Sequence, residues 1–144
     1  MNLLFLFGPN LGALGRRDPQ IYGSQTLDEL MGEVSERGRS LGHVVGWHQS
    51  DHEGELIGWL LGGKAEGIDA VVLNPGALAH YSYALRDAVE ACELPVLEVH
   101  MTNIHAREEF RRHSVVSEVC RATITGLGAG GYHLALEAMP WITS

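Results

Sequence analysis

Short apolar runs recur along the chain and alternate with longer segments in which apolar residues have helical spacing. The runs cover residues 2–7, 43–48, 68–73, 95–99 and 122–125. Short apolar runs bounded by turn-forming residues are typical of strands buried on both faces of a parallel sheet. The segments between them place apolar residues on one helical face. The pattern therefore predicts strands that alternate with helices.

Polar residues mark where the predicted helices begin and end. Thr26 and Glu29 have the spacing of a capping box, as do Ser50 and Glu53, and Gly42 is suited to end the first of these helices. The remaining helices are expected at 84–92, at 134–139 and, as a short polar helix, at 106–112.

Strands alternating with helices favour an open sheet with right-handed crossovers. We therefore expect a single catalytic domain over residues 1–144. Its fold class is α/β: a flavodoxin-like three-layer sandwich, with a five-stranded parallel sheet of order 2-1-3-4-5 and helices on both faces. Ligands of such sheets bind beyond the carboxyl ends of the strands. The segments 10–22, 74–80 and 100–111 follow the first, third and fourth strands and should therefore converge.

The segment 8–23 has neither helical nor alternating periodicity and is rich in Gly and Pro. An irregular loop of this length in a compact domain is usually functional or disordered. It carries Asn10, Arg16, Arg17 and Tyr22, so we interpret it as a functional loop. The alternative is a solvated surface connection.

Composition and charge exclude several classes of protein. With 45% hydrophobic and 19% charged residues, the chain has neither a disordered nor a membrane composition. A formal net charge of −8 argues against a non-specific nucleic-acid binder. The first apolar run is too short for a signal peptide or a membrane span, so we expect a cytoplasmic protein. Cys92 and Cys120 lie in apolar contexts and are expected to be reduced core thiols.

Three patterns resemble known motifs but have simpler explanations. The segment 58–64 has the glycine and lysine spacing of a phosphate loop, but Ala65 replaces the required hydroxyl and no strand precedes it. The glycines of 126–131 follow the last strand, where tight packing explains them better than a dinucleotide site. His48 and His52 have no evident third and fourth metal ligand, so no metal site is expected.

Glu98 and His100 are two residues apart at the end of a predicted strand, so their side chains share a face. A carboxylate beside an imidazole fixes its tautomer and raises its basicity, which suits acid–base chemistry. The alternative is a buried histidine whose hydrogen bond to a buried glutamate serves packing alone. Lys64 is the only lysine and lies away from the predicted site, so Schiff-base chemistry is not expected.

Tyr22 is a candidate base because a nearby guanidinium, from Arg16 or Arg17, would stabilise its phenolate. Arg107 and Arg111 are one helical turn apart in the expected short helix. They are suited to hold a carboxylate, or else to pair with the neighbouring glutamates.

Six ordered segments resemble the type II 3-dehydroquinate dehydratases, through nearly the whole chain: GPNLGALGRRDPQIYG, QSDHEGELI, LNPGALAH, ALRDA, EVHMTNIHAREEFRRHS and GLGAGGY. The resemblance implies the removal of water from 3-dehydroquinate to give 3-dehydroshikimate, in the shikimate or quinate pathway. It also implies a flavodoxin-like fold with neither metal nor cofactor.

The resemblance also implies roles for individual residues. Tyr22 corresponds to the base, Arg17 to the lid residue that assists it, and Asn10 to the residue that places a water against the enolate. His100, oriented by Glu98, corresponds to the acid that protonates the departing hydroxyl. The residues expected to bind substrate are Asn74, which holds that hydroxyl, Met101 and Thr102, which bind the carboxylate, and His80, Asp87 and Arg111, which contact the ring hydroxyls.

Two further implications concern the assembly and the loop. Asp87 is expected to reach a neighbouring subunit's site, within a homo-oligomer of trimers that build into a dodecamer. Arg107 is expected to anchor the loop that carries Tyr22.

Two positions depart from the pattern of these dehydratases. Thr102 replaces a serine beside the substrate carboxylate, and Tyr81 replaces a threonine. Two alternatives therefore stand beside this hypothesis. One is a sibling dehydratase for another hydroxylated cyclic keto acid. The other is a non-catalytic flavodoxin-like module that binds a flavin or a nucleotide.

Overall fold

The computed structural model describes all residues, 1–144, and contains one parallel sheet of five strands. Along the chain the strands are β1 (Asn2–Phe7), β2 (Val44–Gln49), β3 (Ala70–Asn74), β4 (Val96–His100) and β5 (Ala122–Thr125). Their order across the sheet is β2-β1-β3-β4-β5, and each neighbouring pair is parallel. The predicted fold class and strand order are therefore confirmed.

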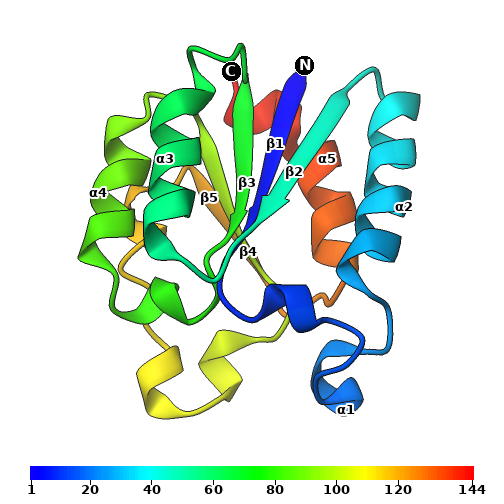
Figure 1. The fold of residues 1–144 in the computed structure, drawn as a ribbon, viewed down its shortest axis with the longest axis vertical. Helices are drawn as coiled ribbons and strands as arrows, with labels where there is room; N and C mark the ends of the chain where they lie inside the picture. Colours follow the sequence, from blue (N-terminus) through cyan, green and yellow to red (C-terminus); the bar gives the residue numbers. More distant parts are fainter.

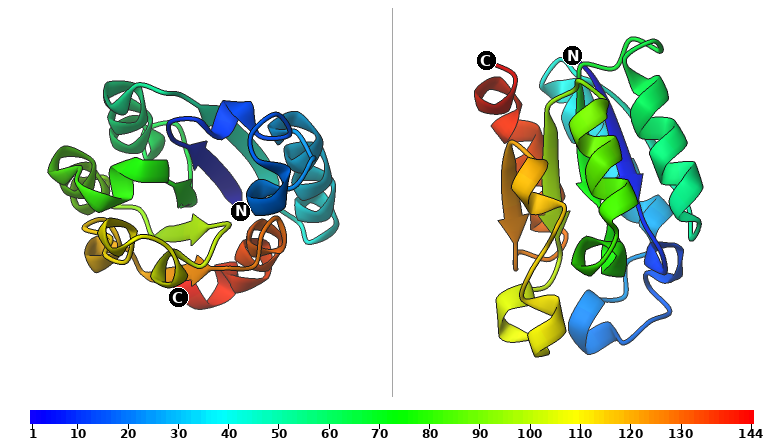
Figure 2. Two further views of the ribbon diagram at one scale, coloured as in Figure 1. Left: turned by 90° about the horizontal axis from the view of Figure 1, so that it is seen from below. Right: turned by 90° about the vertical axis from the view of Figure 1, so that its left-hand side faces the viewer.

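Helices cover both faces of the sheet, as Figures 1 and 2 show. One face packs against α2 (Leu27–Ser40) and α5 (Gly130–Ile142), the other against α3 (Glu53–Gly63) and α4 (Tyr83–Ala91). Side chains of β1 alternate between the two resulting cores. This explains why the central strands β1, β3 and β4 are mostly apolar, whereas the edge strands β2 and β5 are partly exposed.

The start of α2 follows its sequence signal. Thr26 accepts a hydrogen bond from the Glu29 amide, and the Glu29 side chain accepts one from the Thr26 amide, both at 3.2 Å. The predicted capping box is confirmed.

The second predicted capping box is wrong. His52, not Ser50, precedes the first residue of α3 and makes no side-chain capping bond. Ser50 instead donates to Glu55 and accepts from the His52 amide, while Glu53 accepts a hydrogen bond from Ser82, at the start of α4. The same side chains form hydrogen bonds, but with partners that the spacing did not indicate.

Two local predictions differ from the structure. The segment 8–23 is not wholly irregular, because it contains a 3₁₀ turn at Leu11–Ala13 and the four-residue helix α1 (Pro19–Tyr22). The short helix expected at 106–112 is instead two 3₁₀ turns, Ile104–Ala106 and Glu109–Arg111. Arg107 lies between those turns in extended backbone, so no single helix carries both Arg107 and Arg111.

The glycines of 58–64 and 126–131, which resemble nucleotide-binding motifs, have structural roles. Residues 58–63 lie inside α3 rather than after a strand. Gly131 packs against the sheet at the start of α5, where an added Cβ would lie 3.1 Å from a Val99 methyl group. None of the helices has the length and apolar character needed to cross a membrane.

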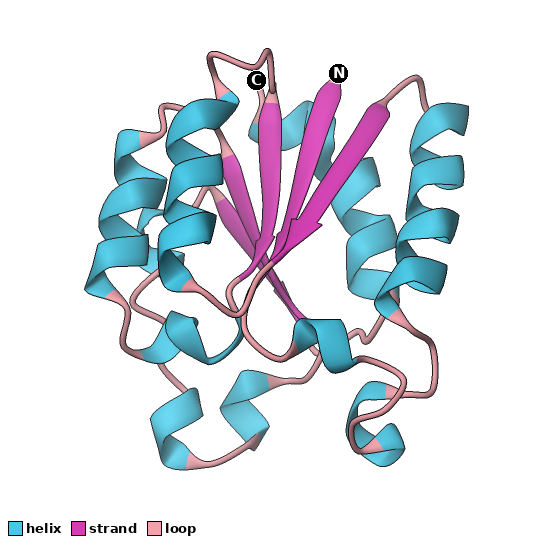
Figure 3. Ribbon diagram, in the orientation of Figure 1, coloured by secondary structure: helices cyan, strands magenta, loops and turns pink.

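The carboxyl ends of the strands face the end of the molecule opposite the two termini (Figures 1 and 3). The loops that gather there include α1 and the 3₁₀ turns. The loops after β1 and β3 approach each other closely. The Gly8 amide donates to the Asn74 carbonyl at 2.8 Å, and a Cβ on Gly8 would lie 2.5 Å from the Pro75 oxygen. Only glycine fits between these two loops.

Candidate active site

The three segments that follow β1, β3 and β4 surround one cleft, as the sequence predicts. The cleft has a volume of about 630 Å³, including space open to solvent. Its lining residues are Pro9, Asn10, Leu11, Arg17, Tyr22, Asn74, Gly76, Ala77, His80, His100, Met101, Thr102, Ile104, Arg107 and Arg111.

His100 and Glu98 form a buried pair at the end of β4. The His100 Nε2 donates a hydrogen bond to Glu98 Oε1, and Glu98 is fully buried whereas His100 reaches the cleft. The shared face predicted from their spacing is confirmed. Because Glu98 occupies Nε2, Nδ1 is the ring nitrogen left for a proton transfer in the cleft.

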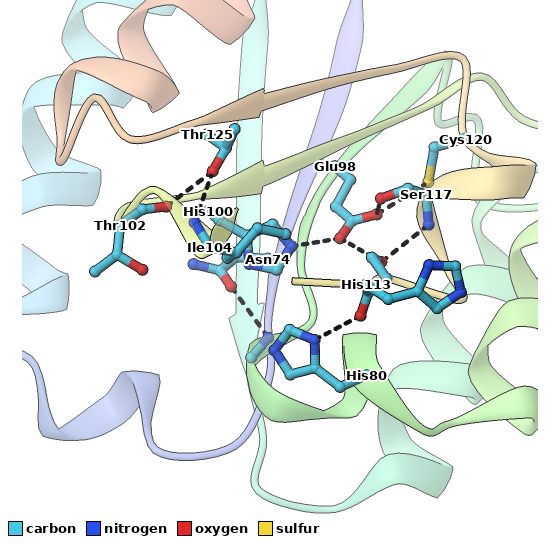
Figure 4. Close-up of polar contacts among 12 residues, drawn as sticks. Asn74, His80, Glu98, His100, Thr102, Ile104, His113, Ser117, Cys120 and Thr125 are labelled. Carbon is cyan, nitrogen blue, oxygen red and sulfur yellow. Dashed lines mark hydrogen bonds and ion pairs between the residues drawn. The ribbon is translucent and has the colours of Figure 1, made fainter. Parts of the chain in front are cut away.

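Glu98 is itself held by two serines that the sequence reading missed. Ser114 donates to Oε1 and Ser117 to Oε2, each at 2.8 Å. Figure 4 shows Ser117 and Cys120 beside Glu98, on the side away from His100. Cys120 lies 4.0 Å from Oε2, and burial together with the Glu98 charge raises the pKa of its thiol. Both cysteines are free thiols, as predicted.

His80 lies beside His100, with ring centroids 6.3 Å apart. Its Nδ1 donates to the His113 carbonyl at 2.9 Å, which leaves Nε2 as an acceptor (Figure 4). Burial lowers the pKa of His80, and the charges of His100 and Arg111 act in the same direction. His80 is therefore suited to accept a hydrogen bond from a ligand hydroxyl near neutral pH.

Asn74, the last residue of β3, is buried at the base of the cleft. Its Oδ1 accepts from the Gly76 amide at 3.1 Å, and its Nδ2 donates to the Tyr132 hydroxyl at 2.7 Å. Tyr132 belongs to α5 and is completely buried.

Tyr22, at the end of α1, contacts two guanidinium groups. The Arg17 Cζ lies 4.7 Å from the centroid of its ring, which is cation–π geometry. The Arg107 Nη1 donates to the Tyr22 hydroxyl at 3.2 Å and lies 3.4 Å from the Thr102 hydroxyl. Of the two arginines, Arg107 is therefore the one that contacts the phenol oxygen.

Asn10 has a left-handed backbone, with a φ of 71°. Its amide donates to Asp51 Oδ1 at 2.8 Å, and Gln49 Nε2 donates to the same oxygen at 3.1 Å. These bonds lower the pKa of Asp51, so the carboxylate stays charged near neutral pH. The end of β2 thus holds the first residues of the loop that carries Tyr22.

The turn after β4 is stabilised by β5. Thr125 Oγ1 donates to the Thr102 carbonyl at 2.9 Å and accepts from the Ile104 amide at 3.4 Å (Figure 4). No group of the chain accepts a hydrogen bond from the amides of Met101 and Thr102. The turn therefore offers two free backbone donors for an anionic group of a ligand.

Arg111 also lines the cleft, where its Nε donates to Glu108 at 2.8 Å. The predicted pairing with a neighbouring glutamate is confirmed, whereas a role in holding a ligand carboxylate stays a prediction. Two predicted site residues do not line the chain's own cleft: Glu98, which contacts it through His100, and Asp87. Asp87 is exposed on α4.

The supporting residues that sequence reasoning missed are Asp51, Ser114, Ser117 and Tyr132. Asp51 had a usable signal, because it follows β2 and so lies at the same edge of the sheet as the other site loops. The serines and Tyr132 had none, since their contacts depend on packing between distant segments.

Lys64 lies outside the cleft and forms an ion pair with Glu93. No cluster of three or more His, Cys, Asp or Glu side chains is arranged to hold a metal ion. The chemistry that the cleft itself offers is proton transfer, with hydrogen-bond donors for oxygen atoms. A flavodoxin-like sheet with a carboxylate-bound histidine and a guanidinium-bound tyrosine at its carboxyl edge defines an acid–base enzyme.

Comparison with known proteins shows the family to which the chain belongs. The family model for class II dehydroquinases matches residues 1–140. A 3-dehydroquinate dehydratase of Thermus thermophilus is 54% identical over 93% of this chain and 90% of its own. One of Deinococcus radiodurans is 52% identical over 94% of each. The crystal structure of type II dehydroquinase from Propionibacterium acnes has a TM-score of 0.92 and 48% identity, covering 96% of this chain and 94% of that one. The chain belongs to the class II dehydroquinase family.

Proposed function

We propose that this member of the family is a 3-dehydroquinate dehydratase, which eliminates water from 3-dehydroquinate to give 3-dehydroshikimate. The observation that carries the proposal is one cleft that contains both a Glu98-bound histidine and a tyrosine in contact with two guanidinium groups. The relatives named for this activity support it. We propose that residues 1–144 act as one catalytic domain.

The reaction begins with removal of a proton from the carbon next to the ketone. Tyr22 takes this proton as its phenolate, whose oxygen contacts the Arg107 guanidinium while the Arg17 guanidinium lies over the ring. The electron pair of the broken C–H bond forms an enolate. Asn10 holds a water against the enolate oxygen, so that negative charge develops beside a hydrogen-bond donor.

The second step breaks the bond between carbon and the departing hydroxyl. The enolate electrons form the new double bond, while His100 Nδ1 supplies a proton and the hydroxyl leaves as water. Glu98 balances the positive charge of the imidazolium before this transfer. Each turnover leaves the proton on Tyr22 and removes one from His100, so solvent exchange restores both groups.

Substrate binding uses the donors and acceptors that the cleft leaves free. The amides of Met101 and Thr102, with the Thr102 hydroxyl, bind the carboxylate. Asn74 holds the departing hydroxyl, while His80 Nε2 and Arg111 contact the ring hydroxyls. Other contacts within the protein already hold these groups in place, so less conformational entropy is lost when the substrate binds.

We also propose a homo-oligomer, a dodecamer built from trimers, in which Asp87 reaches the cleft of a neighbouring subunit. Its exposure on α4, outside its own cleft, is compatible with that role. Tyr81 and Tyr83, near the start of α4, are 64% and 69% exposed. In the proposed oligomer, contact with a neighbouring subunit would remove this aromatic surface from water.

A second candidate is a dehydratase for a related cyclic keto acid. The observation that favours it is Thr102, whose extra methyl group lies at the proposed carboxylate site, beside Arg107. That change narrows the space at the carboxylate without removing a hydrogen-bonding group.

Ultraviolet absorbance on mixing the protein with 3-dehydroquinate tests the proposal, because the product is a conjugated enone carboxylate and the substrate is not. We expect a rise that survives both a chelator and borohydride, which would otherwise stop metal-dependent and imine-dependent reactions. A folded protein that gives no rise contradicts the proposal. If the Thr102→Ser variant then turned over 3-dehydroquinate, the unmodified protein would be assigned to a related cyclic keto acid instead.

A further inference from the structure

Asn74 is held at both ends of its side-chain amide. Its Oδ1 accepts from the Gly76 amide at 3.1 Å, and its Nδ2 donates to the Tyr132 hydroxyl at 2.7 Å. Because a backbone amide can only donate, the Gly76 contact determines which end of the side chain is oxygen. One hydrogen of Nδ2 and one lone pair of Oδ1 remain for a ligand.

Tyr132 is a rigid partner for this amide. It is fully buried on α5, and its ring centroid lies 5.3 Å from that of Phe7 on β1. Burial raises the pKa of the Tyr132 phenol, which keeps it neutral throughout the range in which enzymes work. The hydroxyl therefore accepts the Asn74 hydrogen bond at every working pH.

The two residues are 58 positions apart and belong to different layers. Asn74 ends a central strand, whereas Tyr132 projects from α5, which packs against one face of the sheet. The packing of α5 against the sheet thus determines the direction in which the Asn74 amide points. Rotation of that amide would break the contact with Tyr132, the contact with Gly76, or both.

We propose that Tyr132 is a positioning residue for catalysis, which orients Asn74 so that its free N–H and its free lone pair face the departing hydroxyl. This inference rests on the proposed dehydratase function, because that function assigns the hydroxyl to Asn74. Tyr132 does not line the cleft and touches no reacting atom, so its effect passes through Asn74 alone.

Tyr132→Phe tests the role, because it removes the hydroxyl and keeps the ring that packs on Phe7. We expect kcat/KM for 3-dehydroquinate to fall about tenfold, with most of the loss in kcat, because the misdirected amide no longer meets the departing group. Val34→Ala is the control for lost stability. It truncates a fully buried residue of the same core, away from the cleft, and should leave kcat/KM unchanged where the variant is folded.

A double-mutant cycle separates positioning from general damage. In an Asn74→Ala background no amide remains to orient, so adding Tyr132→Phe should change kcat/KM by less than about twofold. A full tenfold loss in that background overturns the proposal, since Tyr132 would then act through some other group.

Nuclear magnetic resonance of the Asn74 side-chain amide provides a readout without substrate. In the unmodified protein we expect slow solvent exchange of its hydrogens, and in Tyr132→Phe faster exchange and shifted signals. Unchanged signals overturn the orienting role. This result stands even if the protein does not dehydrate 3-dehydroquinate, whereas the absorbance test alone decides the proposed function.

Discussion

Tyr22 lies between two guanidinium groups that contact different parts of its side chain. Arg17 stacks on the ring face, whereas Arg107 donates to the hydroxyl and approaches Thr102 as well. The two arginines therefore play separate parts. Arg107 connects the loop that carries Tyr22 to the turn after β4, and Arg17 belongs to that loop itself.

Tyr22→Phe should abolish most turnover and leave binding nearly intact, because only the proton-accepting oxygen is lost and the ring stays stacked on Arg17. We expect kcat to fall roughly a hundredfold to ten-thousandfold, the range of general-base catalysis. Steady-state kinetics with 3-dehydroquinate measures it. Gln20→Ala, an exposed change in the same short helix, is the control. Near-normal activity of Tyr22→Phe would show that another group is the base.

His100→Ala should affect the two steps unequally. Without the leaving-group acid, elimination should fall sharply, whereas Tyr22 should still exchange the proton next to the ketone with deuterium from solvent. Mass spectrometry of recovered substrate, beside absorbance of the product, measures both. Equal losses of exchange and elimination would contradict the assignment of His100 as the acid.

At the scale of elements, the loop carrying Tyr22 is fixed at both ends. Asp51 and Gln49 hold its start through Asn10, and the Thr26 capping box joins its end to α2. The backbone at Gly15 also lies close to Ser24, because a Cβ added at Gly15 would lie only 2.9 Å from the Ser24 carbonyl oxygen. The central part, which includes Tyr22, lies between these anchors.

Thr26→Ala should lower the free energy of unfolding by about 1 kcal/mol, because it removes the acceptor for the Glu29 amide at the start of α2. Ser35→Ala is the matched control, since it removes a hydroxyl from the interior of the same helix without a capping bond. Urea denaturation measures both. Equal midpoints for the two variants would mean that the cap does not stabilise α2.

At the scale of the molecule, the cleft depends on one property of parallel sheets: the carboxyl ends of all strands meet at one edge. β1, β3 and β4 are adjacent, with Phe7 paired to Asn74 and Leu73 paired to Glu98. Residues far apart in the chain therefore reach the same space. Asp87 does not, because α4 carries it on the outer face.

Subunit mixing tests whether Asp87 completes a neighbour's site. Asp87→Ala and Tyr22→Phe chains should each be weakly active alone. When they are produced together, sites that combine Tyr22 of one chain with Asp87 of another should recover part of the normal activity, which an absorbance assay of the purified mixed oligomer measures. Activity no greater than the sum of the separate variants would place Asp87 outside the neighbour's site.

Much of this protein follows from local sequence. The apolar runs predicted the positions of all five strands, and the alternation of strands with helices predicted the flavodoxin-like fold class with its strand order. The Glu98–His100 pair followed from the two-residue repeat of a strand, and the α2 cap from its spacing. The family resemblance added the roles of Tyr22 and Arg17, which their local pattern alone left weak.

What only the tertiary structure decided is how the site residues are supported. Ser50 and Glu53 match a capping box by spacing, yet competing partners, Glu55 and Ser82, take their hydrogen bonds. Likewise, Tyr132 meets Asn74 only because α5 packs across the sheet. Spacing along the chain determines which side chains share a strand face or a helix end. Contacts between layers depend on how whole elements pack, and that information is spread over the entire core.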